Sequence, residues 1–404
     1  MMWMLMVAIL VCGVHDEVAP GPRGPVGPDV PLSEGERTLL ARCITVEGYT
    51  ADAVQDACRQ AAEKGIRAVL LPAGRYVFDK SVRVPGGLTL IGEGSRTVCQ
   101  AARKDARLFI VEGDNVRFTR LKLVGADTTT NTSNNTYGII VNRRRNARID
   151  HCELLGFSYA LSFGNEATGQ VDHCIIHHNL RDGLGYGVAI YSGAYVLVMD
   201  NEFYQNRHSL ASNGALDWSS PKRLGKYVHK PGFRKTHWEF VHNSVGSNDE
   251  STYELCAVDT HPGMDGSFVV ERNVFEDLRH GVGIRDGSGI IRYNVFRNLR
   301  TRTTFRPVIA ISVSYGTHNG IPVEGCMPNH IWIYDNTFIM PEGAKFERYR
   351  IGKAENIFID GKLVPKTKSD RPAPKTMPLL IPMDATGKLG IGERKVIFTH
   401  QRQD

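Results

Sequence analysis

The sequence predicts an all-β protein that folds as a right-handed parallel β-helix, a solenoid whose successive turns stack strand upon strand. The first observation is a recurring phrase, N-x-F-x-x-x-R-H, at residues 201–208 and 273–280, with a third copy at 294–301 that ends in threonine. The second is a series of seven apolar segments, 21 to 42 residues apart, that each end in Asn or Cys. Self-similarity at this period is typical of stacked repeats, and 41 glycines and 19 prolines in 404 residues favour short strands joined by turns.

The Asn and Cys positions predict a ladder along the solenoid. They are Cys152, Cys174, Asn201, Asn243, Asn273, Asn294 and Asn336. Residues at one phase of successive turns stack at the strand spacing of roughly 4.8 Å. We therefore expect hydrogen-bonded asparagines extended by two buried thiols. His208 and His280 share a phase seven residues past their asparagines, with one turn between them, which places them roughly 10 Å apart on one face.

The two ends of the chain differ from the repeats. Residues 1–14 are almost wholly apolar but shorter than the about 20 residues that span a bilayer. We expect a signal peptide or a lipoprotein-type leader, with Cys12 as the candidate lipid anchor and a secreted, cell-surface or periplasmic protein as the consequence. Residues 15–35 are rich in Pro and Gly and predict a tether. The net charge of +6, without a dense Lys/Arg run, argues against nucleic acid and weakly favours an acidic partner.

Residues 36–114 are expected to form an N-terminal cap and the first turns. Thr50 and Gly65 bracket an amphipathic helix as its N-cap and C′ residues. Three cysteines surround this block and could supply one disulfide, namely Cys43, Cys58 and Cys99. Residues 115–365 then form the solenoid, with long loops at 207–236 and 300–329 where the ladder spacing widens to 42 residues. Residues 366–404 are expected to be a linker and a C-terminal cap.

One strand carries an unusual polar face. In the segment CAVDTH, alternation places Val258 and Thr260 on one face and Asp259 and His261 on the other. Valine is the more natural core residue, so Asp259 and His261 should point out of the solenoid. On the next turn Arg285 should point outward and stack near Asp259. This predicts a polar cluster beside the two Arg-His pairs, Arg207–His208 and Arg279–His280.

Two resemblances extend this prediction. The helix at 50–65 with the phrases LPAGRY and VPGGLTLIGEG resembles the N-terminal part of pectate-lyase-like proteins, which have the pectin lyase fold, and implies that the helix covers the open end of the solenoid. DTH followed by RHGVGIR resembles the D-P-H and K-H-G-I phrases of mannuronan C5-epimerases and related lyases. The resemblance implies a catalytic groove containing Asp259, His261 and His280. Thr260 stands in place of the family's proline and Cys256 in place of its tyrosine, for which Tyr253 is a substitute.

This chemistry matches the residue types. Removal of the proton at C5 of a uronic acid needs a base and a cation that neutralises the carboxylate, and a histidine base contributes about 10²–10⁴-fold. The candidate catalytic residues are His261, Asp259, His208, His280 and Arg285. The candidate substrate-binding residues are Arg207, Arg279, Tyr253 and Lys235. No zinc spacing or calcium loop is present in the sequence. Ca²⁺ held by Asp259, Asp265 or Asp286 stays open as a cofactor.

Three functions remain open. The first is a lyase or C5-epimerase acting on an acidic, uronic-acid-containing polysaccharide. The second is a glycoside hydrolase on the same fold, which needs two carboxylates and could pair Asp259 with Asp217 or Glu239. The third is a non-catalytic carbohydrate-binding or adhesive solenoid, since one fold hosts many functions. We expect a monomer for the enzymes and a trimer for a tail-spike-like adhesin.

Overall fold

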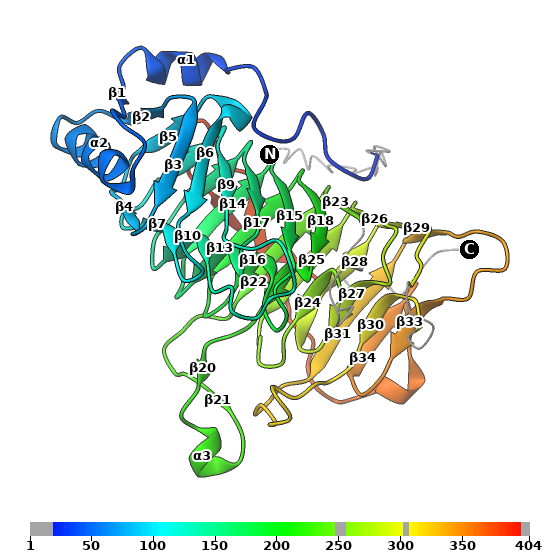
Figure 1. Cartoon of the computed structure of the whole chain (residues 1–404). Helices are drawn as coiled ribbons and strands as arrows, with labels where there is room; N and C mark the ends of the chain where they lie inside the picture. The colour runs from blue at the N-terminus through cyan, green and yellow to red at the C-terminus, as the bar shows by residue number, and fades with distance from the viewer. Residues whose placement is uncertain (1–18, 247–255, 302–306, 397–404) are drawn as a thin grey trace, which may run out of the picture.

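Three long parallel sheets form the body of the molecule (Figure 1). The structure, a computed structural model, describes residues 19–246, 256–301 and 307–396. We name these sheets A, B and C. Each turn passes through one strand of sheet C, one of sheet A and one of sheet B before the next turn begins. Neighbouring strands of one sheet come from successive turns and pair in parallel, as β10 and β13 do with Ile139 opposite Leu161. The predicted all-β, right-handed parallel β-helix is confirmed.

The strands of each sheet follow in stacking order. Sheet A contains β1 (Ile44–Thr45), β2 (Ala68–Leu71), β5 (Thr89–Gly92), β8 (Arg117–Thr119), β11 (Ala147–Asp150), β14 (Thr168–Asp172), β17 (Tyr195–Met199), β22 (His237–Val241), β25 (Ser267–Glu271), β28 (Gly287–Arg292), β31 (Pro328–Tyr334), β34 (Glu355–Ile359) and β35 (Lys362–Leu363). Sheet B contains β3 (Gly74–Phe78), β6 (Thr97–Ala101), β9 (Lys122–Val124), β12 (Glu153–Leu155), β15 (Ile175–Asn179), β18 (Glu202–Asn206), β23 (Ser244–Gly246), β26 (Val274–Glu276), β29 (Val295–Arg297) and β32 (Thr337–Ile339). Sheet C contains β4 (Val82–Val84), β7 (Arg107–Val111), β10 (Tyr137–Asn142), β13 (Tyr159–Gly164), β16 (Tyr186–Ile190), β19 (His208–Ser212), β24 (Val258–Thr260), β27 (His280–Ile284), β30 (Ile309–Val313) and β33 (Glu347–Ile351).

The asparagine ladder runs along the corner between sheets A and B. The backbone N–H of Asn201 donates to Oδ1 of Asn243 at 2.9 Å, and that of Asn243 donates to Oδ1 of Asn273 at 2.8 Å. The pattern continues to Asn294 and Asn336. Cys174 joins the ladder by donating its N–H to Oδ1 of Asn201. The predicted ladder is confirmed, and so is the spacing of His208 and His280, because β24 lies between β19 and β27.

Helix α2 (Ala51–Glu63) lies across the N-terminal end of the solenoid (Figure 1). The side chain of Thr50 accepts a hydrogen bond from the N–H of Ala53, and Gly65 follows the helix with φ +62°, as the sequence predicts. The apolar face of α2 packs Val54, Cys58 and Ala61 into the core. The helix therefore covers a sheet edge that would otherwise be open to pairing.

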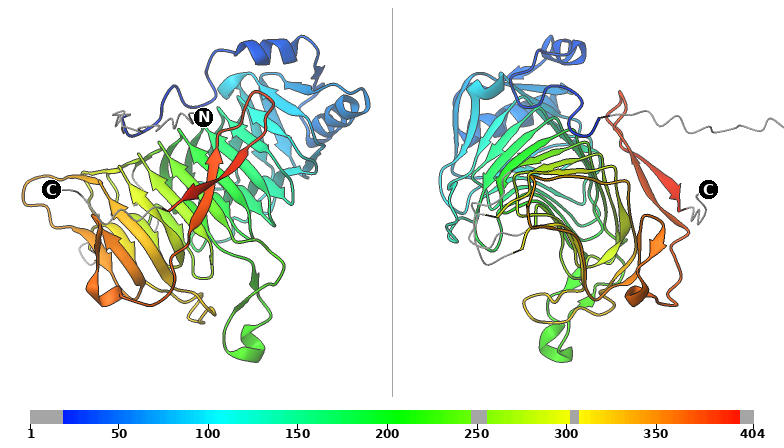
Figure 2. Two further views of the ribbon diagram at one scale, coloured as in Figure 1. Left: turned by 180° about the vertical axis from the view of Figure 1, so that it is seen from behind. Right: turned by 90° about the vertical axis from the view of Figure 1, so that its right-hand side faces the viewer.

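The Pro/Gly-rich segment is a packed strap and not a free tether. Residues 19–32 lie along the solenoid and lead into α1 (Glu34–Leu40), which the sequence did not predict (Figure 2). The guanidinium of Arg23 makes two hydrogen bonds with the carboxylate of Asp200, at 2.9 and 2.8 Å. Farther along, Gly27 donates its N–H to the carbonyl of His173. Glu36 of α1 contacts Arg117 at 2.7 Å and anchors the end of the strap.

The C-terminal segment also packs differently from a cap. The hairpin of β36 (Thr376–Ile381) and β37 (Gly390–Lys395) crosses the outer face of sheet A (Figure 2). Leu380 and Leu389 pack there against Leu197 and Met199. At the last strand of sheet A, β35 pairs antiparallel with β34, and a short 3₁₀ helix, η2 (Pro365–Thr367), follows it. A second 3₁₀ helix, η1 (Gly94–Arg96), follows β5.

All seven cysteines in the described ranges are free thiols, so the cap contains no disulfide. Cys12 and the rest of the leader lie outside the described residues. Over 19–246, 256–301 and 307–396, no helix has the length and apolar character needed to cross a membrane.

Candidate functional site

Strand β24 places Asp259 on the outer face of sheet C. Val258 and Thr260 are fully buried, and Val258 belongs to the core. Asp259 lies in register between Ala211 of β19 and Gly283 of β27. These small neighbours leave room above the sheet for other side chains to reach the carboxylate. The predicted outward orientation of Asp259 and His261 is therefore observed, although only 1% of Asp259 is exposed because its partners cover it.

Arg285 covers Asp259 from the next turn. Its Nε lies 3.1 Å from Oδ1 of Asp259, and its Nη2 contacts Oδ2, which gives a two-pronged ion pair. Burial acts to raise the pKa of Asp259, but the charge of Arg285 and the contact with His261 hold that pKa well below its usual range. Asp259 is thus a buried carboxylate that stays ionised.

Two histidines approach the same carboxylate oxygen. Nε2 of His261 lies 3.0 Å and Nε2 of His208 lies 3.7 Å from Oδ2 of Asp259. Neither Nε2 atom completes a hydrogen bond with any described residue. Nδ1 of His208 donates to the carbonyl of Cys256 at 2.5 Å. Burial lowers the pKa of both histidines, that of His208 strongly, so both rings are neutral at neutral pH.

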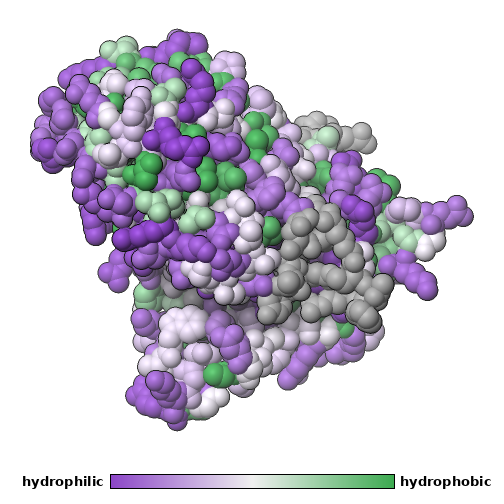
Figure 3. Space-filling view, viewed as in Figure 1, coloured by the Kyte–Doolittle hydropathy of each residue, from purple (hydrophilic) through white to green (hydrophobic). Residues whose placement is uncertain are grey.

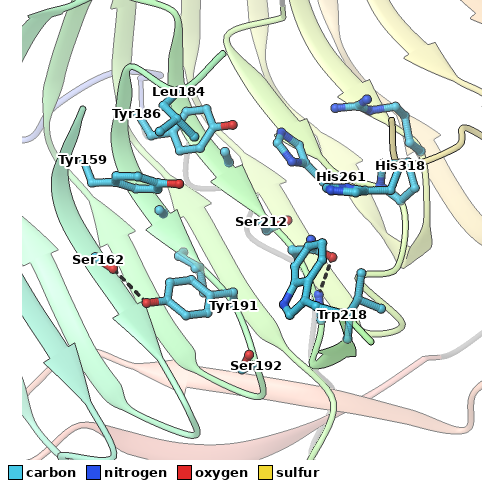
Figure 4. A pocket seen from close by; sticks show the side chains of 18 of the residues that line it. Tyr159, Ser162, Leu184, Tyr186, Tyr191, Ser192, Ser212, Trp218, His261 and His318 are labelled. Carbon is cyan, nitrogen blue, oxygen red and sulfur yellow. Dashed lines mark hydrogen bonds between the residues drawn. The ribbon is translucent and has the colours of Figure 1, made fainter. Parts of the chain in front are cut away.

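A cavity of about 730 Å³ opens above this cluster, within the range of small-molecule and sugar sites. His261 and Arg285 line it, and a row of tyrosines continues it along sheet C (Figure 4). Tyr137, Tyr159 and Tyr186 occupy equivalent positions of β10, β13 and β16. The rings of Tyr137 and Tyr159 stack with centroids 4.6 Å apart. Aromatic faces of this kind suit the apolar faces of sugar rings.

Two long loops form one wall of the cavity. They span residues 213–236 and 314–327, narrower than predicted, because β19 and β30 belong to sheet C. The first loop carries β20 (Leu216–Asp217), α3 (Pro221–Leu224) and β21 (Val228–His229), and Figure 3 shows it as a lobe with a hydrophilic tip at the lower edge of the molecule. Tyr227 joins the loops through backbone hydrogen bonds with Pro322 and Glu324.

An aromatic cluster stands at the cavity side of this wall (Figure 4). The ring of Trp218 lies 4.9 Å from that of His318 and 5.3 Å from that of Tyr227. Trp218 and His318 both line the cavity, and Trp218 is 56% exposed. An exposed tryptophan held edge-on by two neighbours is a ready surface for stacking a sugar.

The charge of the cavity lining is one-sided. Among the described residues, its lining contains Arg207, Lys230 and Arg285 but no Asp or Glu. Arg207 is held by Tyr186, whose hydroxyl lies 3.4 Å from Nη1. The cavity therefore favours an anionic ligand.

The structure gathers some of the predicted site residues and separates others. His261, Asp259, His208, Arg285 and Arg207 come together. His280 is one turn further on, where Nε2 pairs with Oγ of Ser312 at 2.8 Å, and it does not line the cavity. Arg279 turns toward the carbonyl of Pro307. Lys235 is a surface residue that pairs with Asp265 at 3.1 Å. Tyr253 lies outside the described residues.

The carboxylates considered for hydrolysis lie elsewhere. Asp217 accepts hydrogen bonds from the N–H and hydroxyl of Ser219 within the loop. Glu239 is buried on sheet A, where it accepts the N–H of Leu380 and pairs with Arg394 under the C-terminal hairpin. Neither residue lines the cavity.

Asp286 has a structural environment instead of a cation site. Its carboxylate accepts backbone N–H groups of Gly263, Asp265, Gly287 and Met327 at 2.8 to 3.1 Å. These bonds fix the turn after β24 and the end of the second loop against each other. The oxygen atoms that a calcium ion would need are thus already occupied.

Several residues that line the cavity were not predicted from the sequence. Tyr137, Tyr159, Trp218, Lys230 and His318 were not singled out. Tyr137 and Tyr159 had a signal, since each opens a strand in the phrases YGII and YALS, as Tyr186 does in YGVA. Trp218 and His318 had none, because their approach depends on how two loops pack.

The three sheets and the rung order define a right-handed parallel β-helix protein. In agreement, the family model described as "Right handed beta helix region" matches residues 112–228. No curated protein sequence matches the chain.

One alignment with a solved structure supports this fold. An alginate lyase from Paenibacillus sp. str. FPU-7 aligns with a TM-score of 0.50 and 12% identity, over 78% of this chain and 99% of the lyase. A DFA-IIIase from Arthrobacter chlorophenolicus A6 gives 0.49 and 11% identity, over 80% and 93%. The catalytic domain of a GH87 alpha-1,3-glucanase gives 0.47 and 10% identity, over 81% and 60%. The predicted resemblance to pectate-lyase-like β-helix proteins is confirmed at the level of the fold.

Proposed function

We propose that this chain acts on a uronic-acid-containing polysaccharide by removing the proton at C5, as a lyase or a C5-epimerase. The observation that carries the proposal is the lining of the cavity: cations, a neutral histidine and tyrosines, with no Asp or Glu among the described residues. A glycoside hydrolase needs two carboxylates on either side of the bond, whereas proton abstraction beside a carboxylate needs a base, a cation and an acid.

His261 is the proposed base. With its proton on Nε2, facing Asp259 at 3.0 Å, the ring presents Nδ1 as a lone pair. The negative charge of Asp259 then stabilises the positive charge that forms when Nδ1 takes the proton from C5. Burial keeps the pKa of His261 low, so the base is neutral and ready before the substrate binds.

Arg285 and Arg207 are the proposed carboxylate-binding residues. Arg285 uses Nε and Nη2 for Asp259, and its side chain is 37% exposed. Its outer edge can therefore neutralise the uronate carboxylate and stabilise the enolate-like charge at C6 that follows loss of the C5 proton.

Tyr186 is the proposed acid. Its ring lies edge-on to that of His261, with centroids 5.7 Å apart, and burial raises the pKa of its hydroxyl. In β-elimination the C5–H electrons form the C4–C5 double bond, the C4–O bond breaks, and Tyr186 protonates the leaving oxygen. In epimerisation Tyr186 instead returns a proton to the opposite face of C5. Tyr186 thus has the role of proton donor. Cys256, which stands where mannuronan C5-epimerases have a tyrosine, cannot fill that role.

The proposal includes an extracellular or periplasmic location, where such polymers occur, as the apolar leader suggests. The test is incubation of the full chain with a panel of uronic-acid polymers. Ultraviolet absorbance of an unsaturated product supports a lyase, and altered uronate composition without cleavage supports an epimerase. New reducing ends without absorbance would contradict the proposal in favour of hydrolysis, and binding without any product would indicate a carbohydrate-binding solenoid.

A further inference from the structure

Three ligand-type atoms converge beneath the cavity floor. Nε2 of His208, Nε2 of His261 and a carboxylate oxygen of Asp259 all lie within 4.8 Å of one another. The residues come from two turns of sheet C, so the three ligands do not form a motif of short spacing in the sequence. Atoms this close can converge on one metal ion at the usual distances of 2.0 to 2.2 Å after small side-chain shifts.

His208 is pre-oriented for coordination. Its Nδ1 donates to the carbonyl of Cys256 at 2.5 Å, which fixes the tautomer and leaves a lone pair on Nε2. That Nε2 lacks a hydrogen-bond partner among the described residues, in a side chain that is 1% exposed. It faces the charged oxygen of Asp259 at 3.7 Å. Two electron-rich atoms that face each other favour a cation between them, and a backbone carbonyl behind a histidine is the usual support of a metal ligand.

The donor set indicates the type of ion. Two imidazoles and one carboxylate suit Zn²⁺ and the neighbouring late transition metals. Ca²⁺ prefers six to eight oxygen ligands, which this cluster does not offer. Three protein ligands leave at least one coordination position for water.

Arg285 competes for the same carboxylate. Its Nη2 contacts Oδ2 of Asp259, the oxygen that both histidines approach. A divalent cation and a guanidinium cannot share this oxygen without strong repulsion. We propose that His208, His261 and Asp259 bind one Zn²⁺-type ion, and that this ion and Arg285 are alternative partners of Asp259.

Binding has two chemical consequences. Coordination by Nε2 of His261 releases its proton to solvent, and the displaced guanidinium of Arg285 moves away from Asp259. Zn²⁺ binding therefore inhibits the reaction proposed above, because it removes the Asp259–His261 contact. The inhibition rests on the proposed function, whereas the binding does not.

Calorimetric titration of the metal-free full chain with ZnCl₂ tests the binding, in two buffers of different ionisation enthalpy to count the released proton. We expect one ion per chain and proton release. We expect a loss of affinity of at least about tenfold in His208→Ala and in the larger His208→Gln. His330→Ala, which removes a buried histidine of sheet A, is the matched control and should bind as the parent does. Circular dichroism and thermal unfolding establish that each variant is folded.

Arg285→Met tests the competition. We expect tighter Zn²⁺ binding in this variant and near-parent affinity in Arg285→Lys, which keeps the charge. Equal affinity for CaCl₂, or unchanged Zn²⁺ affinity in both His208 variants, would overturn the site. Weaker binding in Arg285→Met would overturn the competition. The polymer assay in excess chelator is independent of these results, so failure of the metal site and failure of the proposed reaction are distinguishable.

Discussion

Nε of Arg285 lies 3.1 Å from Oδ1 of Asp259, although 26 residues separate them in the chain. The two residues meet because β24 and β27 are neighbours in sheet C. The carboxylate is 1% exposed and the arginine side chain 37% exposed. The negative charge is therefore under the cavity floor while the positive charge reaches its surface, which makes the floor attractive to anions.

Loss of Arg285 should destabilise the fold. Arg285→Met leaves the buried carboxylate of Asp259 without its main counter-charge, at an expected cost of about 3 kcal/mol. Urea unfolding followed by circular dichroism measures this cost. Arg297→Met, which removes a half-exposed arginine paired with Glu276, is the control and should change stability by under about 1 kcal/mol. Equal stability of the two variants would show that the Asp259 pair is solvated.

Loss of His261 should remove activity without unfolding the chain. We expect His261→Ala to lower kcat by about 10²–10⁴-fold on the polymer that the parent degrades or epimerises, because a general base contributes this much. His330→Ala should retain the parent rate. Retention of more than a tenth of the parent kcat in His261→Ala would assign the base to another residue.

Stability should fall as the pH drops through the histidine range. Burial lowers the pKa of His280 from 6.5 to about 3. The unfolded chain takes up a proton below about pH 6.5 that the folded chain does not, so stability is full above that pH and is lost progressively toward pH 3. His280 alone contributes up to about 1.4 kcal/mol per pH unit.

This pH dependence can be measured by urea unfolding at pH 7, 5 and 4. His280→Gln keeps a polar side chain beside Ser312 and removes the titration, so its stability should change less steeply with pH than that of the parent. Parallel curves for the two proteins would mean that His280 takes up its proton in the folded state.

Trp218 should contribute to substrate binding and not to chemistry. Its ring is 56% exposed at the cavity wall, and one stacking contact is worth about 1 kcal/mol. We expect Trp218→Ala to raise KM about fivefold with kcat little changed, and Trp218→Phe to restore most of the affinity. A fall in kcat without a change in KM would instead link the loop to the catalytic step.

The rung pattern predicted the fold and the stacking of its turns correctly, although His280 and Arg279 do not line the cavity. The repeated phrases predicted the solenoid, the ladder from Cys174 to Asn336 and the register of His208 with His280. Period-two alternation in CAVDTH predicted the outward direction of Asp259 and His261. The ion pair with Arg285 followed from stacking the next turn. These features are accessible because a parallel β-helix converts sequence period directly into spatial neighbours.

The rung pattern did not predict which partners individual side chains contact. Arg279 and Lys235 were expected to bind substrate, but each is held by other contacts, with the carbonyl of Pro307 and with Asp265. The Pro/Gly-rich segment predicted to be a tether is a packed strap because Arg23 pairs with Asp200, 177 residues away in the chain. The C-terminal hairpin packs on sheet A because Leu380 and Leu389 contact apolar side chains there. None of these contacts can be predicted from the repeat.

The sequence by itself determined the solenoid, the ladder and the polar face of β24, because local alternation and regular stacking decide all three. The tertiary structure alone decided which polar residues share a cavity. Trp218 contacts His318 because two loops pack together. The described lining of the cavity has no negative charge because Arg285 covers Asp259. Such contacts join distant parts of the chain, so their contribution to the free energy of folding cannot be read from any single segment.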